Sequence, residues 1–261
     1  MKLISLNVWG GKMFEPLMDF IKLQSKDTDI FCFQEILTTT SDKTVVNNYR
    51  VNLLDELKSV LPNFDCYFIS LSKTFDSEGS DVDFDLEQGH AIFAKKGIKV
   101  GKHQDKLLLG KKFAKHYNAD YSDFPIDVQY IEISSNNKKY TINNFHGRSY
   151  PGSKLDTPDR LQQSKKLAEV IKNQTGARIL IGDFNLMPET QSIALLEEGM
   201  VNLIKKFNIQ ETRGSLNPYL EHPDWQHFAD FAFVSTDISV KSFALPDARV
   251  SDHMPMILEF E

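Results

Sequence analysis

The segment ILIGDFN, residues 179–185, carries the pattern on which the fold prediction rests. Its apolar residues predict a buried strand near residues 178–182, and this strand runs directly into a carboxylate, Asp183, and a carboxamide, Asn185. A buried strand that ends in polar oxygen atoms is typical of an α/β sheet whose strand ends hold a ligand.

Two further strand-like runs end in the same way. LISLN, residues 3–7, ends in Asn7, and IFCFQE, residues 30–35, ends in Glu35. Because rigid strands hold the loops that converge at their carboxyl ends, we expect these side chains to meet at one edge of the fold. Oxygen ligands of this kind suit Mg²⁺ or Mn²⁺, which needs no cage of histidine and cysteine.

The rest of the chain predicts a β-rich α/β protein. Apolar runs bounded by turn residues predict strands near residues 2–8, 29–34, 65–71, 89–95, 126–134, 139–145, 178–182, 229–235, 238–244 and 256–260. Helical periodicity predicts helices over residues 14–26, 48–61, 156–173 and 193–207. The third helix starts with Thr157, Pro158 and Asp159, and Pro is favourable in a first helical turn.

The composition is that of an ordinary folded protein. The 261 residues are 41% apolar and 25% charged, which excludes collagen-like, disordered and disulfide-scaffold proteins. No Pro-, Gly- or Ser-rich linker divides the chain, so we expect one domain over residues 1–261. The net charge of −6 and the pI near 5.7 disfavour a passive nucleic-acid coat and fit an enzyme that draws cations to carboxylates.

The two cysteines and the lengths of the apolar runs predict a cellular location. Cys32 and Cys66 lie in apolar strand-like segments without CxxC spacing, so we expect buried free thiols in a reducing compartment. The apolar run at the N-terminus is too short for a secretory signal, and no stretch reaches the length of a membrane span. We therefore expect a cytoplasmic protein without stable membrane insertion, and we favour a monomer.

Two histidines add proton chemistry to the expected site. His146 ends the strand-like segment YTINNFH, and His253 lies beside Asp252 just before the last predicted strand. An imidazole that moves protons needs a carboxylate to orient it, and Asp230, which opens the segment DFAFV, is the candidate for this task.

These motifs, taken in order, resemble the endonuclease/exonuclease/phosphatase superfamily, which has the deoxyribonuclease I-like fold. The matching positions span nearly the whole chain and are LNVW at residues 6–9, QE at 34–35, His146, GDFN at 182–185, Asp230 and SDH at 251–253. The resemblance implies an α/β four-layer sandwich, in which two mixed β-sheets pack face to face and are flanked by helices. It also implies hydrolysis of phosphate esters with Mg²⁺ or Mn²⁺ as cofactor.

The resemblance assigns the cation to three residues. Glu35 would be the principal metal ligand, Asn7 would hold metal or water beside it, and Asp252 would complete the cation site. A bound cation places positive charge on the phosphate oxygens, which every phosphoryl transfer needs.

The remaining matches are assigned to catalysis. Asp183 and the Asp230–His253 pair would orient and deprotonate the attacking water, and the sequence leaves open which of Asp183 and His253 is the base. Asn185 and His146 would bind the phosphate oxygens, and His146 would also protonate the leaving group. Such a site attacks the phosphate ester in line with the departing oxygen.

Each of these residues also has an ordinary structural explanation. Asn7 can simply end a strand, Asp183 can form a turn, and an isolated histidine is more often structural than catalytic. All of these separate segments would have to match one family by accident, so we favour the catalytic interpretation of the set. A catalytically silent binding module with the same fold is the alternative from another class.

Residues next to these motifs have structural roles as alternatives to functional ones. Glu87 is the nearest candidate to orient His146, while His90 in the same segment is as well explained as a strand residue. Arg160 and Gln163 are expected to tie the preceding loop in place. Arg148 fits a phosphate contact and a loop-ordering role equally well.

The substrate is narrowed only in part. Abasic-site endonucleases carry a Y-x-P-N motif where this chain has NNFHGRS, residues 143–149, which disfavours that activity. Residues 74–87 contain six acids and no Lys or Arg, whereas residues 95–115 contain eight Lys and one Asp, so the two blocks act in opposite directions on a polyanion. We expect a phosphorylated small molecule or lipid headgroup, with a nuclease acting on DNA or RNA as the alternative.

Overall fold

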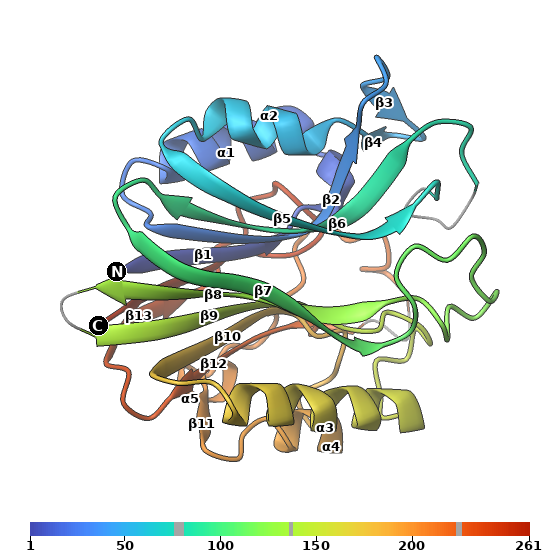
Figure 1. Cartoon of the computed structure of the whole chain (residues 1–261). Helices are drawn as coiled ribbons and strands as arrows, with labels where there is room; N and C mark the ends of the chain where they lie inside the picture. Colours follow the sequence, from blue (N-terminus) through green and yellow to red (C-terminus); the bar gives the residue numbers. More distant parts are fainter. Residues whose placement is uncertain (76–80, 136–137, 223–225) are drawn as a thin grey trace.

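The computed structural model describes residues 1–75, 81–135, 138–222 and 226–261. Two six-stranded mixed sheets pack face to face, and helices cover the outer face of each sheet (Figure 1). The four layers confirm the predicted α/β sandwich. Both chain termini lie at one end of the sandwich, on the left in Figure 1.

The first sheet contains both ends of the chain. Its strands, in spatial order, are β13 (Val240–Ala244), β14 (Met256–Phe260), β1 (Lys2–Asn7), β2 (Ile30–Thr39), β6 (Leu86–Lys95) and β5 (Phe64–Lys73). Strands β1 and β2 are parallel, and β14 runs antiparallel to β1 on its other side. The carboxyl ends of β1 and β2 and the start of β14 therefore lie at the same edge.

The second sheet has the same plan. Its strands, in spatial order, are β11 (Met200–Asn202), β12 (Asp230–Ser235), β10 (Ala177–Asp183), β9 (Lys138–His146), β8 (Ile126–Ser135) and β7 (Lys99–Leu109). Strands β9 and β10 are parallel, and β12 runs antiparallel to β10. The ends of β9 and β10 thus meet the start of β12.

Five α-helices of the described residues form the outer layers. α1 (Phe14–Gln24) and α2 (Leu53–Val60) cover the first sheet, and α3 (Pro158–Lys172), α4 (Gln191–Ala194) and α5 (Leu203–Lys206) lie on the second (Figure 1). The predicted start of α3 is confirmed, since the Thr157 side chain accepts a hydrogen bond from the backbone N–H of Arg160 at 3.2 Å. This cap satisfies one of the free N–H groups of the first turn.

Aromatic packing within the second sheet supports the end of β10. The Phe184 ring, directly after Asp183, lies 4.9 Å from Phe145 and 5.7 Å from Phe231, measured between ring centroids. All three side chains are fully buried. Because packed cores resist displacement, the carboxylate before Phe184 has a rigid support.

A buried polar contact sets the offset between the two sheets. The side-chain amide of Asn144 on β9 donates to the backbone oxygen of Phe33 on β2 at 3.1 Å, and Gln34 Nε2 donates to Asn144 Oδ1 at 2.5 Å. Since Gln34 precedes Glu35 and Asn144 lies two residues before His146, this contact positions the strand ends that carry both side chains.

The predicted helix over residues 193–207 is wrong. The structure places α4, β11 and α5 there instead, because Gly199 adopts a left-handed backbone with φ of 77° and breaks the helix. Asn202 then starts α5, and its side chain accepts hydrogen bonds from two backbone N–H groups of that helix.

Two other segments also differ from expectation. The predicted helix over residues 48–61 begins late, because Asn47 and Asn48 have positive φ and form the turn between the short strands β3 (Val45–Val46) and β4 (Tyr49–Arg50). The lysine-rich residues 95–115 contain the edge strand β7, which has no buried face over most of its length and therefore lacks the apolar alternation of a strand.

The structure also bears on the expectations for the two cysteines and for membrane-spanning segments. Cys32 is buried, Cys66 is partly buried, and both thiols are free. In the described part of the chain, no helix combines the length and apolarity needed to cross a bilayer. Residues 76–80 of the acidic block lie outside the described residues.

Candidate active site

Strand register places five polar side chains of the predicted site together. In the first sheet Asn7 pairs with Gln34, which brings the ends of β1 and β2 side by side, and Glu35 follows. In the second sheet Asp183 pairs with His146 on one side and with Asp230 on the other. The two sheets face each other, so these strand ends form one site at the edge opposite the chain termini.

Glu35 lies in an irregular part of β2. The pairing of β2 with β6 shifts register between Phe33 and Ile36, and Glu35 itself has a φ of 59°. A bulge of this kind redirects a side chain out of the normal alternation of a strand. Glu35 Oε1 accepts a hydrogen bond from Asn7 Nδ2 at 2.8 Å, and the Glu35 side chain is 22% exposed.

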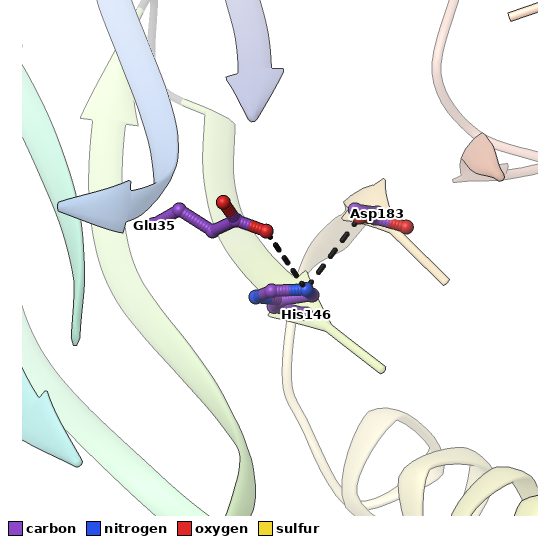
Figure 2. A group of neighbouring side chains, drawn as sticks. All are labelled: Glu35, His146 and Asp183. Atoms are coloured by element: carbon purple, nitrogen blue, oxygen red, sulfur yellow. Dashed lines mark ion pairs between the residues drawn. The ribbon is translucent and has the colours of Figure 1, made fainter. Parts of the chain in front are cut away.

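One carboxylate oxygen, Asp183 Oδ2, is the meeting point of the site. Asn7 Nδ2 donates to it at 3.1 Å, His146 Nε2 lies 3.5 Å away, and His253 Nε2 lies 3.7 Å away. Figure 2 shows His146 between Asp183 and Glu35, whose Oε1 is 3.9 Å from His146 Nε2. Side chains from both sheets therefore converge on one buried acid.

His253 is held on its far side by Asp230. The Nδ1 atom of His253 lies 2.8 Å from Asp230 Oδ2, and both side chains are buried. Thr212 Oγ1 accepts a hydrogen bond from the Asp230 backbone N–H at 3.0 Å, and Ser251 Oγ accepts one from the His253 backbone N–H at 3.2 Å. The pair thus sits on a fixed backbone.

Asp252 contacts His253 of the site, since its Oδ2 atom lies 3.9 Å from His253 Nε2. Its Oδ2 atom faces Arg213 Nη1 at 3.5 Å and Asn217 Nδ2 at 3.4 Å. Among the described residues, the ligand-type atoms that lie within 4.8 Å of one another around Glu35 belong to Glu35, His146 and Asp183. The structure brings Asn7 and Glu35 into contact and leaves Asp252 beside Arg213.

Asn185 contacts Lys154, a residue that the sequence motifs do not predict in the site. Asn185 has a φ of 53°, and its backbone N–H donates to Asp183 Oδ1 at 2.9 Å. The Nζ atom of Lys154 donates to Asn185 Oδ1 at 2.5 Å and to the Ser149 carbonyl at 2.8 Å. Burial, followed by the charge of Arg213, lowers the pKa of Lys154 to about 7. No motif surrounds Lys154 in the sequence, so only the fold could reveal it.

His146 is backed by a second buried histidine. The rings of His90 and His146 lie 5.7 Å apart, and His90 Nε2 lies 3.2 Å from Asp127 Oδ1. Burial lowers the pKa of His146 to about 4, so this imidazole is neutral at pH 7. Glu87, the expected orienting acid, instead pairs with Lys73 at 2.7 Å.

Two arginines order the loops beside the site. The Arg148 guanidinium donates to the carbonyls of Tyr121 and Ser122, so it fastens one loop to another. Arg160 is fully buried and donates to backbone carbonyls of residues 148–155, while Gln163 Oε1 accepts from the Arg148 backbone N–H at 2.9 Å. Arg160 and Gln163 therefore tie the preceding loop in place, as expected.

Burial and neighbouring charges shift the pKa values of three site residues in different directions. Burial raises the pKa of Glu35, and the charges of Asp252 and Asp183 add to this rise while the Asn7 hydrogen bond opposes it. Burial also acts to raise the pKa of Asp183, but its surroundings, His253 foremost, outweigh burial and hold the pKa at about 2. For His253, burial is outweighed by Asp230 and Asp252, which raise the pKa to about 9.

A family model described as the Endonuclease/Exonuclease/phosphatase family matches residues 4–253 of the chain. No protein among the curated sequences is a significant match. The matched range therefore includes every site residue predicted from the sequence.

Solved structures share the fold over the whole chain. An endonuclease/exonuclease/phosphatase from Bacteroides vulgatus is 16% identical with a TM-score of 0.69, covering 100% of this chain and 98% of that chain. A mannosyl-6-phosphatase from Bacteroides thetaiotaomicron VPI-5482 is 17% identical with a TM-score of 0.67, covering 100% and 99%. The human Nocturnin catalytic domain with bound sulfate is 16% identical with a TM-score of 0.66, covering 100% and 94%. At these identities the likeness establishes the fold alone.

Proposed function

Because the chain belongs to the endonuclease/exonuclease/phosphatase family, whose members hydrolyse phosphoester bonds, we propose that it is an Mg²⁺- or Mn²⁺-dependent phosphoesterase. An activated water attacks phosphorus in line with the departing oxygen. The substrate is a phosphorylated small molecule or lipid headgroup.

The convergence on Asp183 carries this proposal. A buried carboxylate that faces two imidazole Nε2 atoms, at 3.5 Å and 3.7 Å, and a carboxamide at 3.1 Å has the partners that water activation requires. A purely structural acid would need only one such partner, and burying four polar groups together costs stability unless they serve a site.

The pKa directions support a division of labour around the water. Asp183, with a pKa of about 2, is a carboxylate at neutral pH and can accept a proton. His253, with a pKa of about 9, is an imidazolium whose Nε2–H faces that carboxylate. We therefore assign the general base to Asp183, with His253 and Asp230 orienting the water and supplying positive charge.

His146 and Asn185 face the phosphate in this scheme. His146 is neutral at pH 7, so its Nε2 can carry the hydrogen that bonds a phosphate or leaving oxygen. Asn185 is pinned by Asp183 and Lys154, which holds its carboxamide in one orientation. Fixed donors aimed at developing charge lower the barrier more than mobile ones.

The residues present fit a hard divalent cation. Glu35 offers carboxylate oxygen atoms at the edge of the site, and Asn7 lies beside it, with Nδ2 donating to Glu35 Oε1 at 2.8 Å and Oδ1 accepting from the Trp9 backbone N–H at 2.9 Å. Burial raises the pKa of Glu35, and a bound cation would oppose that rise. We assign the cation to Glu35 and Asn7, with Asp252 contributing its charge through the same site. When bound, the cation stabilises negative charge on the phosphate and favours ionisation of water.

A nuclease is the alternative, and the lysine-rich residues 95–115 are the feature that favours it. Lys99, Lys102 and Lys106 are exposed on the edge strand β7, whose end at Leu109 lies on the same side of the sheet as His146. Lys112, in contrast, is engaged by Asp105 and Asp127. Phosphates of a polymer would contact exposed lysines of this kind.

The test is hydrolysis of p-nitrophenyl phosphate, bis(p-nitrophenyl) phosphate and supercoiled plasmid, each with Mg²⁺, with Mn²⁺ and with excess chelator. We expect cation-dependent release of p-nitrophenol, little nicking of the plasmid, and a loss of about 100-fold or more for Glu35→Gln. The matched control is Glu15→Gln, an exposed acid on α1, which should retain full activity.

Three outcomes would contradict the proposal. Equal hydrolysis in chelator, or an unchanged rate for Glu35→Gln, would remove the cation from the mechanism. Robust nicking at physiological salt would favour the nuclease, and no hydrolysis of any ester would favour a silent binding module.

A further inference from the structure

A pocket of about 500 Å³ adjoins the candidate active site. Glu35 and His146 belong to both the pocket lining and the site, and many of the other lining residues come from the segments 116–126 and 147–152. A volume of this size holds one small molecule and is far from the open groove that a duplex requires.

The pocket opens on one side of the site only. Glu35 and His146 line it, whereas the described residues around it do not include Asp183, Asp230 or His253. In an in-line displacement, the attacking water and the departing oxygen lie on opposite sides of phosphorus. With the water at Asp183, the pocket receives the departing alcohol.

One wall of the pocket is aromatic. The ring of Tyr117 lies 5.1 Å from that of Phe75 and 5.0 Å from that of Phe124, and Leu71 and Ile126 extend this apolar surface. Aromatic and aliphatic surface of this kind packs against a flat or ring-shaped ligand rather than a short, fully hydrated one.

The rim of the pocket is polar but not cationic. Gln88, His116 and Asn118 offer hydrogen-bonding groups, and Asp81 adds a negative charge. Arg148 is the only Lys or Arg among the described residues of the lining, and its guanidinium is engaged by backbone carbonyls and lies 3.6 Å from Asp159. A second phosphate in the pocket would meet uncharged hydrogen-bonding groups and the negative charge of Asp81, with no positive charge available in the described lining to balance its own.

The walls are built before any ligand binds. Arg148 fastens the 121–122 backbone, and Arg160 fastens residues 148–155, both through several hydrogen bonds to carbonyl groups. A preformed pocket spends little free energy on ordering, so its shape contributes directly to selectivity.

We propose that this pocket binds the alcohol part of the substrate, and that this alcohol is a neutral, hydroxylated ring compound bearing a single phosphate. The inference rests on the proposed phosphoesterase activity and names the substrate class for it. A sugar phosphate and a nucleoside monophosphate both have this chemistry, because each offers a ring face to the aromatic wall and hydroxyl groups to the polar rim.

The experiment compares kcat/KM, measured by phosphate release with Mg²⁺, for four esters. Glucose 6-phosphate and adenosine 5′-monophosphate carry a neutral ring. Glycerol 3-phosphate has a similar alcohol leaving group without a ring, and glucose 1,6-bisphosphate adds a second phosphate. We expect one of the two ring monophosphates to exceed glycerol 3-phosphate by about tenfold or more, as one ring stacked on an aromatic wall provides. For the sugar, the bisphosphate should be at least about tenfold worse than the monophosphate.

Pocket variants link the preference to this wall. Tyr117→Leu and, separately, His116→Ala should raise KM for the preferred ring monophosphate at least about fivefold, with a smaller rise of KM for glycerol 3-phosphate. The matched controls are Tyr130→Leu, whose hydroxyl bonds Gln104 on the outer strands, and His103→Ala, exposed on β7. Thermal melting of each variant checks that the fold survives.

The results separate this inference from the proposed function. Hydrolysis of p-nitrophenyl phosphate together with equal kcat/KM for ring and acyclic esters would overturn the pocket assignment and leave the phosphoesterase standing. A preference for the bisphosphate would overturn it as well. Absence of hydrolysis for every ester would overturn both.

Discussion

The Nδ1 atom of His253 lies 2.8 Å from Asp230 Oδ2, while Nε2 of the same ring faces Asp183 Oδ2 at 3.7 Å. The imidazole therefore bridges two buried carboxylates that come from adjacent strands, since Asp183 and Asp230 are register partners of β10 and β12. This bridge makes the charge of each group depend on the others.

The bridge predicts that His253 and Asp230 act as one unit. His253→Ala and Asp230→Asn should each lower kcat by about 100-fold or more with small changes in KM, because both orient the water and neither holds the substrate. The double variant should be no slower than His253→Ala. Steady-state kinetics on p-nitrophenyl phosphate, with melting curves for all three proteins, measures this coupling.

Independent losses would contradict this unit. If the fold-losses of the two single variants multiply in the double variant, Asp230 does not act through His253, and its contact at 2.8 Å serves the fold alone.

Lys154 predicts an unusual dependence of stability on pH. Its folded pKa of about 7 lies below the ordinary value of 10.5, so the folded state carries an unfavourable charge below pH 7. Above pH 7 the folded state releases this proton while the unfolded chain keeps it, so stability rises with pH until the unfolded group also titrates. The cost is therefore largest in acid and disappears near pH 10.

Comparison with Lys154→Met isolates this effect. We subtract the free energy of unfolding of the variant from that of the unmodified protein, both measured by urea denaturation. This difference should increase by about 2–4 kcal/mol between pH 6 and pH 10. Lys165→Met, on the exposed face of α3, is the matched control and should show no such trend. A difference that stays constant with pH would show that the Lys154 ammonium is not strained by burial.

Arg160 is expected to hold the loop that forms one wall of the pocket. Arg160→Met removes the guanidinium hydrogen bonds to the carbonyls of Arg148, Ser149 and Pro151, of which the bond to Arg148 is buried, and should cost about 2–4 kcal/mol of unfolding free energy. KM should rise more than kcat falls, because residues 147–152 contact the bound alcohol. Arg249→Met, at an exposed position, should change neither quantity. A stability loss without any change in KM would separate the loop from substrate binding.

The strand-end residues of the site could be predicted because each ends or starts an apolar run. Asn7, Glu35, His146, Asp183 and Asp230 carry a local pattern, and the register of two parallel pairs converts that pattern into proximity. The family resemblance added the order of the motifs along the chain, which no single strand contains.

Other parts of the site have no local signal. Lys154 lies in a loop and reaches Asn185 only because Arg160 folds that loop back, and His90 faces His146 only because two sheets pack face to face. Arg213, distant in sequence, lies 3.5 Å from the Asp252 carboxylate, and no motif predicts this contact. Tertiary contacts of this kind follow from packing and not from periodicity.

The central claim is that Asp183 activates the attacking water. Its most direct test is single-turnover hydrolysis of p-nitrophenyl phosphate by Asp183→Asn with saturating Mg²⁺, beside Asp19→Asn, an exposed residue of α1, as control. Asp183→Asn should lower the single-turnover rate by about 1,000-fold or more with substrate affinity within a few-fold of the unmodified protein, and Asp19→Asn should change neither. A rate for Asp183→Asn within tenfold of the unmodified protein would show that Asp183 is not the general base.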